Sequence, residues 1–233
     1  MKKQTIIVTG ASSSIGKEIA RCCLENGDNV VINALNAEIL TEIFFELGGS
    51  ENLAMVAGNV SNRVTGIKLL AVAIATFGSA DVLINNVGIS ETRSFFDLDE
   101  AYLERFLNTN LKGAVLTTQT IIPQMIKQGG GMVINIGTPL GNDTFSNAFP
   151  TVQIATKGTI HFLTLQLAAE FGKYNIRFNT IMPGSVRTLK YKNAVDRNLE
   201  SRLWNRVGEV EEIAEMVYMV IKSSFITGAI ITT

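Results

Sequence analysis

A chain of 233 residues with 46% hydrophobic side chains can bury one sizeable core, so we expect a single domain over residues 1–233. A formal net charge of −1 excludes the basic excess typical of nucleic-acid-binding proteins. No apolar run reaches the roughly 18 residues that a membrane-spanning helix needs, and the first predicted strand directly follows Lys3. We therefore expect a cytoplasmic protein with no membrane, nucleic-acid or metal partner. Cys22 and Cys23 point about 100° apart on a predicted helix, which disfavours a disulfide between them.

The first stretch with a clear pattern, residues 5–20, predicts a buried strand, a glycine turn and the start of a helix. Ile6 to Val8 form the continuous β-branched run expected of a central parallel strand. Gly10 lets the chain turn sharply, and Gly16 lets the following helix pack closely on the strand. The N–H groups of such a turn and helix N-terminus carry a partial positive charge that suits a pyrophosphate. The turn is therefore our candidate nucleotide-binding segment.

Further along the chain, strand-like apolar runs alternate with helical patterns and no linker interrupts them. Strands are predicted at residues 29–33, 53–57, 82–84, 132–136, 177–182 and 228–232. Helices are predicted at residues 16–26, 38–47, 65–77, 151–171 and 211–221, with two helical stretches between residues 98 and 128. Residues 185–207 lack periodicity and are expected to form a flap. The alternation predicts an α/β fold, a single Rossmann-like doubly wound parallel sheet with helices on both faces.

Four short motifs occur in this framework in a characteristic order. They read Thr9-Gly10…Gly16, Asn85-Asn86-Val87-Gly88, Asn110-Leu111-Lys112-Gly113 and Pro183-Gly184-Ser185-Val186-Arg187-Thr188. They resemble the T-G-x-x-x-G-x-G, N-N-A-G, N-L-x-G and P-G-x-[IV]-x-T motifs of the classical short-chain dehydrogenase/reductase family. The resemblance covers nearly the whole chain. It implies an oxidoreductase in which a nicotinamide cofactor exchanges hydride with a small carbonyl or alcohol substrate.

The resemblance also implies a set of cofactor-binding residues. They are Gly10, Ser12, Ser13, Ser14, Ile15, Gly16, Asn36, Asn59, Val60, Asn86, Val87, Gly88, Lys157, Pro183, Gly184 and Val186. Ser14, Val87 and Asn59 stand where the family has glycine, alanine and aspartate. The second predicted strand ends without an acidic residue for a ribose 2′-hydroxyl or a basic residue for a 2′-phosphate, so NAD and NADP both remain candidates.

The family's proton-handling set of Asn, Ser, Tyr and Lys corresponds here to Asn110, Thr138, Gln153 and Lys157. The resemblance implies that Asn110 takes part in a proton relay and that Lys157 binds the nicotinamide ribose. Thr138 keeps a hydroxyl that can donate to a substrate oxygen. Gln153 departs most from the pattern, because a neutral amide has no proton to exchange near pH 7.

Three side chains could approach the site in place of the tyrosine, namely His161, Asp143 and Tyr191. A lone histidine on an apolar helix is more often a core residue, and Asp143 and Tyr191 are more often solvated loop residues. None of the three is therefore favoured as the missing acid.

Three functions remain open at this point. The first is an NAD(P)-dependent oxidoreductase of short-chain dehydrogenase type that uses an unidentified or water-borne acid. The second is a catalytically silent paralogue that binds nucleotide or a partner protein, and the third is a non-redox reaction in which Lys157 and Gln153 polarise a carbonyl. We expect assembly into a homodimer through the apolar-rich helices at residues 111–125 and 151–171, rather than a homotetramer.

Overall fold

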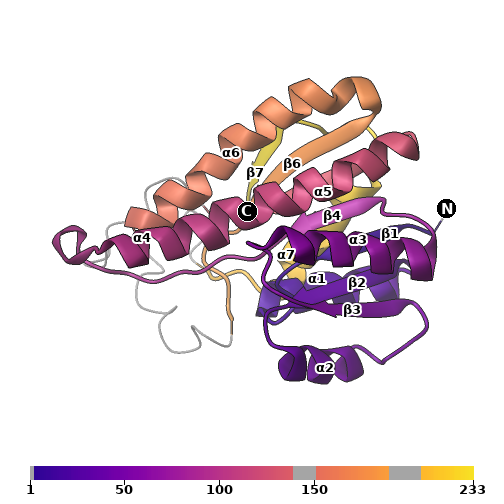
Figure 1. The fold of residues 1–233 in the computed structure, drawn as a ribbon, viewed down its shortest axis with the longest axis horizontal. Coiled ribbons are helices and arrows are strands. Elements are labelled where there is room, and N and C mark those ends of the chain that lie inside the picture. The colour runs from indigo at the N-terminus through magenta and orange to yellow at the C-terminus, as the bar shows by residue number, and fades with distance from the viewer. Residues whose placement is uncertain (1–2, 139–150, 189–205) are drawn as a thin grey trace.

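The computed structural model describes residues 3–138, 151–188 and 206–233, and it has a layer of helices on each face of a central sheet (Figure 1). In the described residues the sheet has seven strands in the order β3-β2-β1-β4-β5-β6-β7, and every neighbouring pair is parallel. The strands are β1 (Thr5–Val8), β2 (Asn29–Ala34), β3 (Leu53–Ala57), β4 (Val82–Asn85), β5 (Gly131–Ile136), β6 (Ile176–Met182) and β7 (Ala229–Thr232). The predicted doubly wound parallel sheet is confirmed.

The strand order reverses between β1 and β4, which pair directly with Ile6 opposite Val82 and Val8 opposite Ile84. Because all strands are parallel, their carboxyl ends share one edge of the sheet, and ligands of such sheets bind beyond that edge at the reversal. The segments that follow β1, β4, β5 and β6 therefore meet there. These segments carry three of the four sequence motifs and Thr138.

Seven α-helices connect or flank the described strands. They are α1 (Ser14–Glu25), α2 (Ala37–Glu46), α3 (Arg63–Phe77), α4 (Glu100–Phe106), α5 (Gly113–Lys127), α6 (Thr151–Phe171) and α7 (Val210–Lys222). Short 3-10 turns lie at Phe95–Asp97 (η1) and Gly172–Tyr174 (η3). Observed bounds agree with the predicted ones to within about two residues for α1, α2, α3, α6 and α7.

The helical stretch between residues 98 and 128 differs from its prediction as two separate helices. A π-helical segment, η2 (Leu107–Lys112), joins α4 to α5 without a break in helical backbone geometry, and the three form one long rod (Figure 1). A π-helical turn accommodates an extra residue in a continuous helix. The pattern of apolar residues shifts across such a turn, so the sequence suggested two helices.

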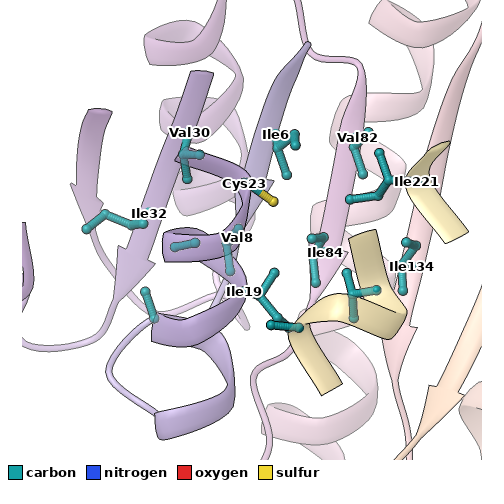
Figure 2. Packing of buried hydrophobic residues seen from close by; sticks show 14 of the residues in the cluster. Ile6, Val8, Ile19, Cys23, Val30, Ile32, Val82, Ile84, Ile134 and Ile221 are labelled. Carbon is teal, nitrogen blue, oxygen red and sulfur yellow. The ribbon is translucent and has the colours of Figure 1, made fainter. Parts of the chain in front are cut away.

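Two apolar clusters hold the layers together, one on each face of the sheet. Figure 2 shows the first, where α1, α2 and α7 cover β1, β2, β4 and β5. Ile19 lies beside Val8 and Ile84, and Ile221 lies beside Val82. On the opposite face α3, α5 and α6 cover the same strands, and Phe178 and Met125 are fully buried there. Since β1 and β4 are buried on both faces, their sequences are continuously apolar, as predicted.

A chain of buried polar side chains crosses the second face near the carboxyl edge of the sheet. The Asn85 amide donates to Thr118 Oγ1 and to Asn135 Oδ1, each at 2.9 Å. Asn135 in turn donates to Thr164 Oγ1 at 2.9 Å, and the hydroxyls of Thr164 and Thr180 lie 2.7 Å apart. These bonds join α5, β4, β5, α6 and β6. The register of α6 against the sheet therefore depends on directional contacts as well as on apolar packing.

The predicted flap at residues 185–207 lies for the most part outside the described residues. Its described ends approach each other, because Val186 forms a β-bridge with Gly208 and Arg187 N–H donates to Gly208 O at 2.8 Å. The single domain predicted over residues 1–233 stays a prediction.

Replacing Asn135 with alanine should destabilise the protein. The change removes a partner from Asn85 and one from Thr164, and each buried polar group left without a partner costs about 1–3 kcal/mol. Urea unfolding of Asn135→Ala measures this loss. Thr159→Ala is the matched control, since that exposed hydroxyl bonds only to Ala155 O in its own helix. Equal stability of the two variants would show that the polar chain does not stabilise the fold.

Candidate active site

The turn after β1 owes its shape to its glycines and to Ser13. Gly10 has a φ of +69°, a conformation that favours glycine. The Ser13 hydroxyl donates to Gly10 O at 2.9 Å and accepts from Gly16 N–H at 3.0 Å, so Ser13 is the N-cap of α1. A Cβ on Gly16 would lie 2.4 Å from Gly10 O and 2.5 Å from Asn86 Nδ2. The close approach of helix to turn that the sequence suggested is therefore present.

Asn86 fastens this turn to the end of β4. Its side-chain amide donates to Thr9 O and Gly10 O at 3.0 Å each and contacts Ser13 Oγ at 3.1 Å. Its backbone N–H donates to Thr9 Oγ1 at 3.1 Å. The nitrogen of the predicted cofactor-binding residue Asn86 is thus fully used within the protein, and the residue shapes the turn.

The turn also presents donors that have no acceptor in the described part of the chain. Among the described residues, the N–H groups of Ser12 and Ile15 have no acceptor, and the first turn of α1 contains no acidic side chain. Such N–H groups, together with the helix dipole, form a cradle for an anion. A pyrophosphate is an anion of the kind that such a cradle binds, and Gly16 lets α1 pack closely enough on the turn to form it.

Other predicted cofactor residues have local structural roles. Asn36 Oδ1 caps α2 by accepting from Glu38 N and Ile39 N, and Asn59 Oδ1 accepts from the backbone and hydroxyl of Ser61. Each amide nitrogen remains as a donor. These carboxamides therefore hold the loops after β2 and β3 at the carboxyl edge of the sheet.

The remaining predicted cofactor residues line the same edge. Val60 lies against Gly113, where a Cβ would be 2.7 Å from Val60 Cγ2, and Val87 lies against Gly10. Pro183 is buried at the end of β6, and the next residue, Gly184, donates its N–H to Thr233 O at 3.2 Å.

Lys157 lies at the centre of the candidate site. Its Nζ donates to Ile136 O at 3.3 Å, at the end of β5. A Cβ on Gly88 would lie 2.6 Å from Lys157 Nζ and 3.5 Å from Asn110 Oδ1. The absence of a side chain at Gly88 therefore brings α6, the loop after β4 and η2 together around one ammonium group.

Asn110 fixes this loop from the π-helical segment. Its Oδ1 accepts from Ile89 N at 2.8 Å, and its Nδ2 donates to Thr156 Oγ1 at 3.0 Å and Ile89 O at 3.3 Å. The π-helical turn aims a buried side chain inward at this point, as π-turns at functional sites do. Asn110 thus positions the Gly88–Ile89 backbone beside Lys157.

Burial lowers the pKa of the Lys157 ammonium to about 8. No carboxylate of the described residues forms an ion pair with it, so the loss of hydration is not offset. A lysine with this pKa exchanges a proton near neutral pH far more readily than a solvated one.

Gln153, one helical turn before Lys157, has a partner that the sequence did not reveal. The hydroxyl of Ser90 donates to Gln153 Oε1 at 2.6 Å. The oxygen already accepts this bond, and the amide nitrogen, which is a donor, stays available for a ligand. Ser90 was missed because it is a single polar residue in a loop, and its contact with α6 exists only in the fold.

The other candidates are distributed as follows. Thr138 is half-buried two residues beyond the end of β5, on the same edge of the sheet as Lys157. His161 is buried, as expected of a core histidine, whereas Asp143 and Tyr191 lie outside the described residues. In the part of the chain that the structure describes, no three His, Cys, Asp or Glu side chains are grouped to hold a metal. None of the described helices combines the length and the hydropathy of a membrane span.

Comparison with known proteins gives the family. Residues 4–198 match the family model described as short chain dehydrogenase, so the chain belongs to that family.

Relatives of this chain include two named enzymes. The L-rhamnose 1-dehydrogenase (NAD(P)(+)) of Azotobacter vinelandii is 31% identical over 97% of this chain and 93% of its own length. The 3-oxoacyl-[acyl-carrier-protein] reductase of Thermotoga maritima is 28% identical over 99% of this chain and 96% of its own length. A crystal structure of 3-ketoacyl-(acyl-carrier-protein) reductase from Brucella melitensis, complexed with NADH, has the same fold with a TM-score of 0.91. At 23% identity it covers 99% of this chain and 96% of that one.

Proposed function

We propose that this protein is an NAD(P)-dependent oxidoreductase that transfers hydride between a nicotinamide cofactor and a small carbonyl or alcohol substrate. The main support is the desolvated Lys157 ammonium, held beside Gly88 and the Asn110-bound loop at the reversal of strand order. The named relatives include a dehydrogenase and a reductase, which favours this function over a catalytically silent paralogue.

The proposed cofactor site extends along the carboxyl edge of the sheet. The N–H groups of Ser12 and Ile15 would hold its pyrophosphate, on a turn that Gly16 lets pack closely against α1. Thr138 and the Pro183–Gly184 segment would hold its nicotinamide end. A bound nicotinamide supplies or accepts the hydride, and every other requirement of the reaction falls to side chains of this chain.

Lys157 is the proposed proton donor to the substrate oxygen in the reductive direction. With Gln153 in place of a phenol, the Lys157 ammonium has a pKa near the working pH and lies in the candidate site. Thr138 and the Gln153 amide nitrogen donate hydrogen bonds to the same oxygen and orient it. In the oxidative direction the neutral amine of Lys157 takes the proton from the alcohol.

A homodimer in the cytoplasm is the proposed state of the protein. Its interface is formed by α5 and α6, whose outer faces expose Phe162 (69%), Leu165 (40%) and Ile126 (37%). Such side chains lose unfavourable contact with water when two copies pair. Static light scattering at micromolar concentration should report twice the chain mass, and Phe162→Glu should give the monomer. A monomeric wild type would contradict the proposal.

Titration with NADH and with NADPH tests the function directly. Fluorescence should show saturable binding of at least one of them to the wild type. Gly16→Ala should weaken it by roughly tenfold or more, about 1.4 kcal/mol, because the added Cβ forces α1 away from the turn. Gly172→Ala is the matched control, since no atom lies within 4 Å of a Cβ there. Absence of binding to the wild type would refute the proposed function.

The pH dependence of turnover tests the role of Lys157. Because the ammonium form donates, carbonyl reduction should fall as pH rises through about 8, and alcohol oxidation should rise over the same range. Lys157→Met should lose activity in both directions at every pH. Lys68→Met, which removes an exposed lysine on α3, should leave the profile unchanged. A reduction rate that stays constant well above pH 8 would assign the proton to another group.

Restoring the phenol provides a further test of the site. In Gln153→Tyr the new hydroxyl lies one helical turn from Lys157, whose positive charge lowers the pKa of the phenol. A positioned general acid contributes roughly 10²- to 10⁴-fold, so reduction of simple ketones should accelerate by up to that factor. Gln153→Phe, which has the ring without the hydroxyl, should show no gain. A wild type faster than Gln153→Tyr would mean that Gln153 serves a different mechanism.

A further inference from the structure

His161 is the single histidine of the chain, and it lies on α6 one helical turn beyond Lys157. Only 2% of its surface is exposed. Neither Nδ1 nor Nε2 has a hydrogen-bond partner among the described residues. Buried polar atoms nearly always have partners, so this imidazole is an exception that needs an explanation in terms of the site around it.

The ring is pressed against the backbone that leads to Thr138. A Cβ on Gly137 would lie 2.8 Å from His161 Nε2, with Thr180 Cγ2 at 2.9 Å and Met182 Cγ at 3.3 Å from the same point. Gly137 itself is tied to β6, since its N–H donates to Ile181 O at 2.8 Å. The imidazole therefore fills the space behind Gly137, the residue bonded directly to Thr138.

The surroundings of the ring contain little to stabilise a positive charge. Gly137, Thr180 and Met182, which face it from the β5 and β6 side, are uncharged, and the nearest titratable side chain along its own helix is the cationic Lys157. Burial lowers the pKa of His161, so the neutral ring is the form that fits.

We infer that His161 is a positioning residue whose neutral ring supports Gly137 and thereby holds Thr138 toward the substrate. The ring is too deeply buried to touch substrate, so it acts through the Gly137–Thr138 backbone. Protonation creates a charge that needs water or an anion, and the ring leaves its place behind Gly137 to reach one. At low pH Thr138 is then no longer held toward the substrate, whereas the nucleotide turn after β1 stays intact. This inference rests on the proposed role of Thr138.

Nuclear magnetic resonance tests the inference without any need for activity. Because the chain has one histidine, a single imidazole signal reports its titration. The midpoint should lie below the ordinary value of about 6.5, and the Thr138 amide and methyl signals should shift with the same midpoint. In His161→Leu the Thr138 signals should stay constant over that range. An imidazole midpoint at or above 6.5, or Thr138 signals that ignore the titration, would overturn the inference.

A histidine at a second position tests whether any imidazole charge on the same helix, even an exposed one, shifts the Thr138 signals. In His161→Leu combined with Gln166→His, the imidazole stands on the exposed face of the same helix. It should titrate near 6.5 and leave the Thr138 signals unmoved. If the Thr138 signals follow this exposed imidazole as well, burial behind Gly137 is not the cause and the inference is wrong. Should His161→Leu not fold, His161→Gln replaces it as a polar, non-titrating variant.

Kinetics separate positioning from a purely structural role. In the wild type, kcat for carbonyl reduction should fall below the His161 midpoint, approaching about tenfold per pH unit as a one-proton titration requires. The KM for whichever of NADH and NADPH binds should stay nearly constant, because the nucleotide turn is not involved. In His161→Leu this fall in kcat at low pH should disappear, and a variant that keeps it would contradict the inference. Failure of both NADH and NADPH to bind refutes the proposed function but leaves the resonance result to decide on His161.

Discussion

The site depends above all on the way the ends of β1 and β4 are joined. These strands flank the reversal of strand order, and the Asn86 side chain bonds to three acceptors on the turn that follows β1. That turn can accept the amide only because Gly16 has no side chain at the point of contact. Without this junction, α1 could not direct its N-terminal N–H groups toward the edge of the sheet. The anion cradle is thus a consequence of close packing.

A second constraint fixes α6, the helix that carries Gln153, Lys157 and His161. The hydrogen bonds of Asn135 and Thr164 tie its middle to the sheet, and the bond from Asn110 to Thr156 ties its first part to η2. A helix packed only by apolar contacts can slide or rotate at small cost, whereas buried polar partners penalise any shift. The positions of these three candidate side chains therefore follow from polar contacts on the inner face of the helix.

The glutamine at position 153 changes the chemical character of the site. The Gln153 oxygen is occupied by Ser90, which leaves a donor nitrogen, and Lys157 contributes an ammonium whose hydration is largely lost. With the Thr138 hydroxyl, the groups of the proposed site are mainly donors. Such a set suits a carbonyl oxygen or an oxygen that gains negative charge in the reaction. A phenol at position 153 would make proton transfer easier. Without it, the donors still match an oxygen that gains negative charge.

The sequence by itself determined the sheet, because continuous β-branched runs such as Ile6–Val8 can be buried on both faces only in a parallel sheet, and the glycine spacing of Gly10 and Gly16 specified the turn. It also determined the candidate residues, since Asn110, Thr138 and Lys157 are recognised by their order along the chain. Only the tertiary structure decided their surroundings. The Ser90–Gln153 bond, the desolvation of Lys157 and the unpartnered ring of His161 all arise between segments distant in sequence. Local pattern reports what each residue can do, whereas burial and partners depend on which segments the fold brings together.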